Sequence, residues 1–321
     1  MSAQNNFSFN TTAEEVVSAL ASEIKGKNVL VTGTSINGIG FETARTLAKY
    51  ANLVIITGHN QERLELSKEA IKKDYPSANI HCLTIDLLSF ASIRKAAAEV
   101  NALPEPLHVL INNAASVPEH FSVTEDGIES QYATNHIGPF LFTKLVTPKI
   151  LAAATSTYTP RVVWVSSEAH RTGPGVDFAE LTNPDPAKYA AFKKYPETKS
   201  ANVLSAIELS KRSKGKINSY SLDPGVIYSR AYEQAHVVQT FKGLGFLHED
   251  GAKSDSIPWK TLGQGASTTV VAAFDPRLND KPGVYLKDCV VTEAASHSAD
   301  PAAAEKLWNI TETIIGEKYT F

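Results

Sequence analysis

Residues 28–50 read N-V-L-V-T-G-T-S-I-N-G-I-G-F-E-T-A-R-T-L-A-K-Y, and this stretch decides the fold. The apolar V-L-V run predicts a buried strand, Gly33, Gly38 and Gly40 predict a turn, and residues 41–50 have helical spacing. A strand, a glycine turn and a helix in this order place backbone N–H groups and the positive end of a helix beside a diphosphate. Glycine suits such a turn because a Cβ atom would obstruct both the turn and the ligand. The stretch therefore predicts a dinucleotide-binding unit.

The rest of the chain alternates apolar runs with helical patterns, so we expect an α/β fold. Such alternation predicts a Rossmann-type, doubly wound parallel sheet with helices on both faces. The expected strands are residues 29–31, 53–56, 80–85, 107–111, 161–165, 217–222 and 283–291. The expected helices are residues 41–50, 61–74, 92–103, 135–151, 195–212, 265–274 and 301–315.

The domain organisation is indicated by the segments that interrupt this alternation. No repeat or low-complexity linker divides residues 28–321, so we expect a single domain there. Residues 1–27 form an expected N-terminal leader with a helix over 11–24. The apolar residues on one face of that helix, which we expect to dock on the domain, are Val16, Val17, Leu20 and Ile24. Residues 229–262 have weak periodicity and many Gly, His and aromatic residues, so we expect a mobile apolar lid.

The composition limits the partners and the compartment. The chain has 321 residues, 43% hydrophobic and 20% charged, with a formal net charge of -3. This balance gives no reason to expect nucleic acid or an anionic membrane as a partner. No run of about 20 apolar residues is present, so we expect no membrane anchor. Cys82 and Cys289 lie in apolar stretches typical of buried free thiols, which fits a reducing compartment, and we expect a cytoplasmic protein.

Five landmarks, in order, resemble the short-chain dehydrogenase/reductase family, particularly its fungal and retinol-dehydrogenase-like members. They are the glycine turn, Asn112-Asn113-Ala114-Ala115, the N-H-I-G-P-F segment at Asn135, Ser166-Ser167, and Tyr195-Pro-Glu-Thr-Lys199. The runs that begin at Trp259 and Gly283 extend the resemblance over nearly the whole chain. Two features depart from the family pattern. Four residues instead of three separate Gly33 from Gly38, and Ala115 stands where glycine is usual.

The resemblance implies an oxidoreductase that transfers a hydride between NADP(H) and a carbonyl or alcohol substrate, with Tyr195 as the acid/base. Free tyrosine has a pKa near ~10, too high for a base at neutral pH. Lys199 comes one helical turn later, and its charge at ~4.5 Å and an effective dielectric of about 20 would lower that pKa by about 2–3 units.

The family also implies roles for three side chains around that tyrosine. Family members use the lysine to bond the nicotinamide ribose, the serine to hold the substrate oxygen and the asparagine to hold a relay water. These roles fall here to Lys199, Ser167 and Asn135. Without Tyr195, Ser167 would more simply be a serine that satisfies backbone groups at the end of a strand.

A second Y-x-x-x-K sequence, Tyr189 to Lys193, competes with the first. We expect Tyr195 to be the catalytic residue because a long helical stretch comes after Lys199, whereas Pro196 would interrupt a helix through Tyr189. Tyr189 then belongs to the loop before the catalytic helix.

The residues directly after the second strand predict the cofactor. Rossmann proteins that bind NAD usually place an acid about 20 residues after the glycine turn. This chain has Gly58-His59-Asn60 there, and His59 stands where NADP-dependent relatives often have arginine. Histidine weakens the usual phosphate clamp, but Arg63 on the next helix supplies a positive charge, so we expect NADP(H); the alternative is that His59 and Arg63 are ordinary loop and helix-surface residues. Asp86 and Leu87 match the family's adenine-side turn, although Asp86 alone would also suit a helix N-cap.

The expected cofactor contacts come from these matched segments and from the catalytic pair. They are Gly33, Thr34, Ser35, Asn37, Gly38, Ile39, Gly40, His59, Arg63, Asp86, Leu87, Asn113, Ala114, Ala115, Tyr195, Lys199, Pro224, Gly225, Val226, Ile227 and Ser229.

Other functions on the same fold remain as alternatives. A catalytically silent NADP-binding regulator is disfavoured by the intact Tyr195 and Lys199, and a Rossmann-type methyltransferase needs no such pair. The expected partner is a small, apolar carbonyl or alcohol, and the expected assembly is a homodimer or homotetramer. No metal is expected, since the scattered histidines lack ligand spacing. These are His136, His170, His236 and His248.

Overall fold

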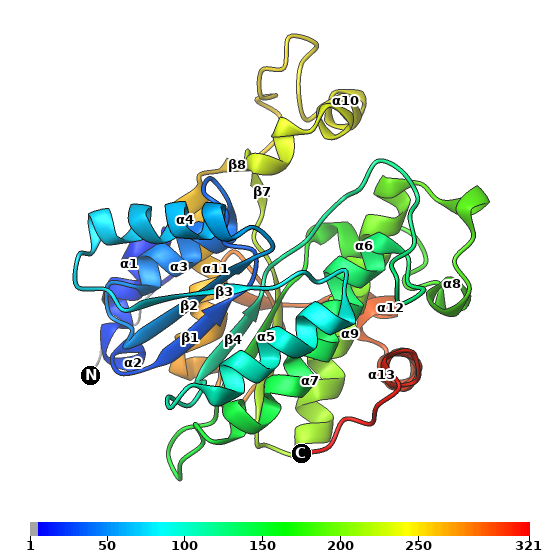
Figure 1. Ribbon diagram of the computed structural model, residues 1–321. Coiled ribbons are helices and arrows are strands. Elements are labelled where there is room, and N and C mark those ends of the chain that lie inside the picture. Colours follow the sequence, from blue (N-terminus) through cyan, green and yellow to red (C-terminus); the bar gives the residue numbers. More distant parts are fainter. Residues whose placement is uncertain (1–5) are drawn as a thin grey trace.

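Residues 6–321, which the computed structural model describes, form a central sheet with helices on both faces (Figure 1). The strands are β1 Asn28–Val31, β2 Leu53–Gly58, β3 Ile80–Thr84, β4 Val109–Asn112, β5 Arg161–Val165, β6 Asn218–Asp223, β7 Val226–Ile227, β8 Trp259–Lys260, β9 Tyr285–Lys287 and β10 Val290–Thr292. The sheet order is β10-β9-β6-β5-β4-β1-β2-β3, and β7 pairs separately with β8. The order reverses between β1 and β4, and ligands of such sheets bind beyond the carboxyl ends of the strands at that point. The expected doubly wound α/β architecture is confirmed.

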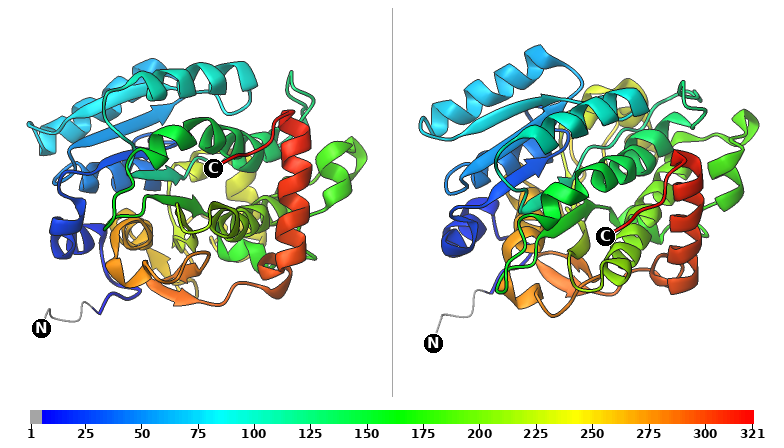
Figure 2. Two further views of the ribbon diagram at one scale, coloured as in Figure 1. Left: turned by 90° about the horizontal axis from the view of Figure 1, so that it is seen from below. Right: turned by 60° about the horizontal axis from the view of Figure 1, so that its bottom comes forward.

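Side chains of each strand alternate between two layers of helices, since they point to opposite faces of a sheet. In β1, Leu30 joins one buried cluster, whereas Val29 and Val31 join the other. The Leu30 layer contains α5 Phe90–Ala102, α7 Gly138–Leu151, α9 Ala191–Ser213 and α13 Pro301–Ile315. The opposite layer contains α1 Ala13–Ala19, α2 Ala21–Ile24, α3 Ile39–Leu47, α4 Gln61–Asp74 and α11 Leu262–Phe274. Figure 2 shows α13, in red, packed outside α9.

Shorter helices lie in the connections. They are α6 Ser130–Tyr132, a π-helical turn Ala133–Ile137, α8 Phe178–Thr182, α10 Ala235–Gly243, α12 Ser296–Ala299, and 3₁₀ turns at Glu168–Arg171, Pro186–Lys188, Arg230–Glu233 and Pro276–Leu278. In Figure 1, α10 and its flanking loops, in yellow, stand out from the layered body. Over the described residues, none of the helices combines the length and the apolar character that crossing a bilayer requires.

The N-terminal helical segment is anchored by a capping box. The Thr12 hydroxyl accepts a bond from the Glu15 N–H at 3.3 Å, and the Glu15 carboxylate accepts one from the Thr12 N–H at 2.7 Å. The expected apolar face is buried, with Val16 and Val17 fully inaccessible. The single expected helix is divided in two, because α1 ends at Ala19 and α2 begins at Ala21. Residues 1–5 of the expected leader lie outside the described residues.

Two expected elements are wrong in their details. Residues 283–291 are not one strand: β9 and β10 are antiparallel, joined by Asp288 and Cys289, which have positive φ of 51° and 67°. Two successive left-handed residues make a tight hairpin turn, and the sheet is therefore mixed at this edge. The catalytic helix begins at Ala191, not at Tyr195, and Pro196 lies inside it. One missing backbone hydrogen bond near the helix start is tolerated because neighbouring residues of α9 are buried.

Candidate active site

The glycine turn after β1 accommodates its extra residue through Asn37. Asn37 has a φ of 64°, and asparagine is among the few side chains that adopt the left-handed conformation readily. Gly33 is also left-handed, at 71°, and Gly38 is the N-cap of α3. The first N–H groups of α3, which have no partner within the helix, therefore lie at this turn. Members of the resembled family bind a diphosphate there.

The loop after β4 packs directly onto this turn. The Asn113 side chain donates hydrogen bonds to the carbonyl oxygens of Thr32 and Gly33, at 2.8 and 3.1 Å. A Cβ atom at Gly40 would lie only 2.3 Å from that amide nitrogen, so a side chain is excluded there. Ala115 is not among the residues with positive φ in the described chain, so alanine causes no strain in place of the family's glycine.

A depression beside the glycine turn brings together the two side chains expected at the adenosine end, His59 and Arg63. Ser35, His59 and Arg63 line it together with Thr34. Asn60 begins α4 by accepting a bond from the Arg63 N–H at 2.9 Å, so Arg63 belongs to the first turn of that helix. His59 and Arg63 are exposed, and within residues 6–321 neither the His59 ring nor the Arg63 guanidinium makes a hydrogen bond or ion pair. Groups of this kind suit a phosphate.

The side chains of Thr34 and Asp86 form hydrogen bonds with backbone groups of the protein. The Thr34 hydroxyl is buried and donates to the carbonyl oxygen of Thr57 at 3.2 Å. The Asp86 carboxylate accepts from the Leu88 N–H at 3.0 Å, and the N-cap of α5 is Ser89, so the alternative of Asp86 as a helix cap is wrong. Leu87 is buried, and a Cβ at Gly138 would lie 2.6 Å from its carbonyl oxygen.

Tyr195 and Lys199 lie one turn apart on α9, beside the carboxyl end of β5. The Lys199 ammonium is buried, donates to the carbonyl oxygen of Val165 at 2.9 Å, and lies 5.3 Å from the centre of the Tyr195 ring. Burial lowers the pKa of Lys199 to about 8, although the Asp223 carboxylate opposes that change.

The expected lowering of the Tyr195 pKa by Lys199 is wrong in this structure. Burial raises the pKa of Tyr195 to about 12, the Ser167 hydroxyl lowers it by hydrogen bonding, and the Asp223 carboxylate raises it again. Burial is thus the largest influence on the Tyr195 pKa, and it acts against the expected lowering. At neutral pH the Tyr195 hydroxyl carries its proton and is equipped to act as an acid.

The two serines after β5 have different roles. The Ser166 hydroxyl donates to the carbonyl oxygen of Lys199 at 2.7 Å and so fastens β5 to α9. The Ser167 hydroxyl accepts from the Ala169 N–H at 3.2 Å, and it lies near enough to Tyr195 to lower the pKa of that tyrosine. This pairing brings the two hydroxyl groups expected at a substrate oxygen together.

Asn135 lies in the π-helical turn and is almost fully buried, at 1% exposure. Its side-chain nitrogen donates to the carbonyl oxygen of Ser116 at 3.0 Å and to the Thr198 hydroxyl at 3.1 Å. Its oxygen accepts from the Ser116 N–H at 2.7 Å. Asn135 thus joins the loop after β4 to α9, and π-helical turns are often found at functional sites.

Tyr189 lies in the loop before α9, as expected. Its hydroxyl donates to the carbonyl oxygen of Pro118 at 2.6 Å, and its ring packs edge-on against Phe121. Tyr189 is therefore engaged away from the Tyr195–Ser167 pair.

The segment after β6 leads from the expected nicotinamide contacts into the expected lid. Gly225 has a φ of 87°, and a Cβ there would lie 2.8 Å from the Lys260 side chain. Val226 and Ile227 form β7, which pairs with β8 at the other end of the lid. Pro224 is buried and Ser229 partly exposed. The start of the expected nicotinamide loop is therefore held in place by the pairing of β7 with β8.

The segment between β7 and β8 packs against the site. The ring of Phe241 on α10 meets Phe192 of α9 edge-on at 5.9 Å. The His236 ring hydrogen bonds to the carbonyl oxygen of Val117 at 2.8 Å. Neither Phe192 nor Asp223 was expected as a site residue, and Phe192 is signalled only by its place one turn before Tyr195. Cys82 is half-buried and Cys289 buried, both as free thiols.

Comparison with known proteins assigns the family. A family model described as short chain dehydrogenase matches residues 27–177. Short-chain dehydrogenase TIC 32 A, chloroplastic, of Brassica napus is 36% identical over 312 residues, covering 95% of this chain and 93% of that protein. Retinol dehydrogenase 12 of Mus musculus is 32% identical over 295 residues, covering 92% and 88%.

A solved structure supports the fold independently. The structure of a short chain dehydrogenase from Escherichia coli CFT073, complexed with NADPH, matches with a TM-score of 0.62 at 19% identity, covering 83% of this chain and 98% of that chain. Together with the extent of the sequence matches, the arrangement around Tyr195 leads to one assignment. The chain belongs to the short-chain dehydrogenase/reductase family, in its retinol-dehydrogenase-like part, and is an oxidoreductase.

Proposed function

We propose that the protein reduces a carbonyl compound with NADPH, or oxidises the corresponding alcohol with NADP. The observation that carries this proposal is the pairing of the Tyr195 and Ser167 hydroxyls, with Lys199 one turn away. Two hydroxyl groups that meet in a partly covered site can both bond one carbonyl oxygen.

The chain's own groups supply the proton side of the reaction. Bound NADPH supplies the hydride that the carbonyl carbon accepts. Tyr195 gives its proton to the carbonyl oxygen, and Ser167 donates a hydrogen bond to that oxygen. Since burial keeps the pKa of Tyr195 near 12, the tyrosine is protonated at neutral pH, as reduction requires. In the oxidation direction the same hydroxyl would have to be deprotonated first.

The preference for NADP(H) over NAD(H) rests on charge. His59 and Arg63 line one depression with the glycine turn, and neither is neutralised by a partner among the described residues. A carboxylate in this place would bond a ribose hydroxyl and repel a phosphate. The NADPH complex of the Escherichia coli neighbour is in keeping with this choice of cofactor.

The substrate class is proposed from the lid. Its aromatic side chains form a contiguous group, with Tyr232 contacting Tyr228, Phe241 and Trp259. An aromatic cover of this kind favours an apolar carbonyl or alcohol. The regulator without turnover is disfavoured because the tyrosine, serine and lysine are all present and assembled.

A screen of NADPH oxidation tests the proposal. Aromatic, aliphatic and steroid-like carbonyls are offered at neutral pH, and loss of absorbance at 340 nm is followed with Tyr195→Phe as the matched control. The proposal expects tyrosine-dependent turnover with apolar members of the panel. NADPH binding without turnover of any carbonyl or alcohol would favour the regulator instead.

A further inference from the structure

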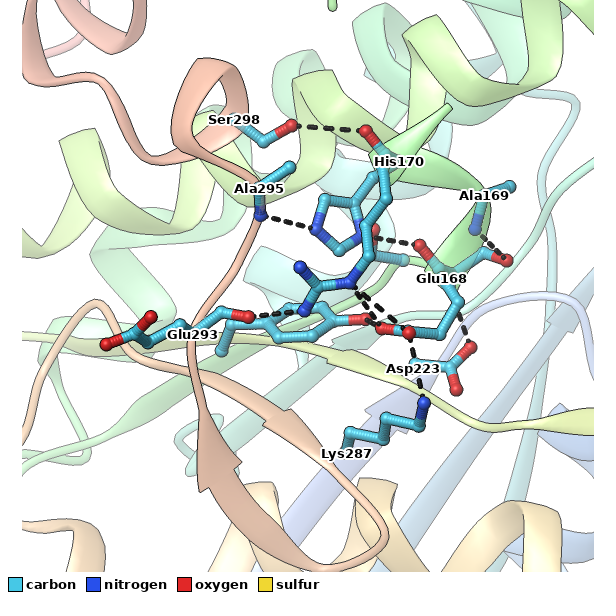
Figure 3. A network of polar contacts seen from close by, with 12 residues as sticks. Glu168, Ala169, His170, Asp223, Lys287, Glu293, Ala295 and Ser298 are labelled. Atoms are coloured by element: carbon cyan, nitrogen blue, oxygen red, sulfur yellow. Dashed lines mark hydrogen bonds and ion pairs between the residues drawn. The ribbon is translucent and has the colours of Figure 1, made fainter. Parts of the chain in front are cut away.

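Asp223, the last residue of β6, joins two loops of the proposed active site with one carboxylate. Figure 3 shows it beside Glu168. One of its oxygens accepts a hydrogen bond from the Glu168 N–H, and the other accepts one from the Gly225 N–H, both at 3.0 Å. Glu168 directly follows Ser167, and Gly225 begins the expected nicotinamide loop. The carboxylate thus adds a side-chain link between two loops that follow the paired strands β5 and β6.

The carboxylate is unusual in its surroundings. Asp223 is 3% exposed, and within residues 6–321 no Lys, Arg or His side chain forms an ion pair with it. A buried charge without an ion-pair partner is costly, whereas backbone N–H groups alone can be satisfied by neutral acceptors. Burial accordingly raises the pKa of Asp223, and its two N–H bonds counteract that rise.

The ionisable groups around Asp223 come from three elements. Glu168 belongs to the 3₁₀ turn, Tyr285 and Lys287 to β9, and Tyr195 and Lys199 to α9. The Glu168 carboxylate already has partners, because Lys287 and Arg171 contact it at 3.0 and 3.1 Å (Figure 3). Asp223 makes no such close contact, although the charge of Lys287 lowers its pKa, and its own charge raises the pKa of both Tyr195 and Lys199.

We propose that Asp223 is a positioning residue for hydride transfer, which clamps the Ser167 loop to the Gly225 loop and places its negative charge beside Tyr195 and Lys199. This inference rests on the proposed reductase function. Asp223 does not contact the substrate in this proposal. Its two hydrogen bonds hold the loops, and its charge acts on Tyr195 and Lys199.

The first test is Asp223→Asn, which removes the charge and one of the two acceptors. Loss of a negative charge lowers the pKa of Tyr195 and Lys199, so the alkaline limb of the kcat/KM profile should move to lower pH by at least about half a unit. Loosening of the two loops should lower kcat at least ~10-fold. Glu168→Gln is the matched control: it removes a neighbouring charge, keeps both N–H bonds, and should leave kcat within about threefold and the limb in place. An alkaline limb in Asp223→Asn that coincides with that of the wild type would overturn the proposal.

A second pair of variants leaves Asp223 unchanged, in case Asp223→Asn does not fold. Glu168 is the first residue of its 3₁₀ turn and follows an extended Ser167 with φ -168° and ψ 153°, so the backbone there suits proline, whose ring would displace the Asp223 oxygen from this nitrogen. Glu168→Pro removes the N–H group that donates a hydrogen bond to Asp223, whereas Glu168→Ala keeps that group. We expect a kcat for Glu168→Pro at least ~10-fold below that of Glu168→Ala. Equal kcat values would contradict the clamp.

Tyr195→Phe separates the failure of this inference from that of the function beneath it. If Tyr195→Phe retains full turnover, the proposed function itself fails. Suppose instead that Tyr195→Phe is inactive, while Asp223→Asn behaves as Glu168→Gln and Glu168→Pro behaves as Glu168→Ala. Then only the role of Asp223 is wrong. Binding of NADPH, followed by its fluorescence, provides a readout without turnover: Asp223→Asn should weaken it at least ~3-fold because the Gly225 loop is released.

Discussion

Tyr195 and Tyr189 share a sequence pattern but have different surroundings, and this difference gives the sharpest prediction at the scale of single residues. Tyr195→Phe removes the hydroxyl paired with Ser167 and should lower kcat by about 10²–10⁴-fold, the usual contribution of general acid catalysis. Lys199→Ala should cost a similar factor and also weaken NADPH binding. Steady-state kinetics and NADPH titration measure both effects.

Tyr189→Phe is the matched control for that experiment. Its hydroxyl bonds only the carbonyl oxygen of Pro118 among the described residues, so kcat should remain within about threefold of the wild type. The opposite result, with Tyr189→Phe inactive and Tyr195→Phe active, would show that the catalytic tyrosine has been placed wrongly.

The proposed preference for NADP(H) should depend on His59 and Arg63. We expect kcat/KM with NADPH to exceed that with NADH by at least ~10-fold. Arg63→Ala should reduce that ratio by removing a charge, and His59→Asp should reduce or invert it because the new carboxylate repels a phosphate. Lys68→Ala, a change of charge elsewhere on α4, serves as the control. Equal use of both cofactors by the wild type would disprove the assignment.

At the scale of elements, the end of α9 is strained. Lys214 follows this helix with a φ of 51° and ψ of 47°, a left-handed conformation in which glycine costs least. Lys214 is exposed, so Lys214→Gly should raise the free energy of unfolding by about 1 kcal/mol. Lys216→Gly is the control, because Lys216 has no positive φ in the described chain and glycine there should lower stability. Chemical denaturation measures both, and a destabilised Lys214→Gly would refute the account.

The segment that carries α10 should respond to ligands. Its contacts with the site are few: the Phe241–Phe192 ring pair and the bond from His236 to Val117. We therefore expect amides of residues 235–258 to exchange quickly without ligand and at least several-fold more slowly with NADPH and a substrate analogue. Amides of the buried helix α11 should not change. Slow exchange over residues 235–258 that ligands leave unaltered would exclude a lid.

Sequence patterns determined most elements but not their special turns. The bounds of β5 and α13 are set by unbroken apolar or amphipathic runs and agree with the structure. The β9–β10 hairpin was missed because its turn is Asp288-Cys289 and contains no glycine. Tyr195 was found because its partner is on the same helix. Asp223 was not, because its two donors come from separate loops that only the folded sheet brings together.

At the scale of the whole molecule, α1 belongs to the core of the fold. Val16 and Val17 are fully buried in the cluster that includes α11, and Gln264 of α11 reaches the carbonyl oxygen of Asn10 at 3.4 Å. Val17→Ala should lower the free energy of unfolding by about 2–3 kcal/mol. Ser18→Ala, at the exposed neighbouring position, should change it by less than about 0.5 kcal/mol. Equal effects of the two changes would show that α1 contributes little to the core.

The packing of α1 against α11 also has a consequence for biosynthesis. A ribosome completes α1 long before it reaches the partner helix at residues 262–274. At roughly 5–20 residues per second, the apolar face of α1 waits about 10–50 seconds for α11 to emerge. During that interval the nascent chain exposes the apolar face of α1. Chaperones that bind exposed apolar segments would be expected to recognise it.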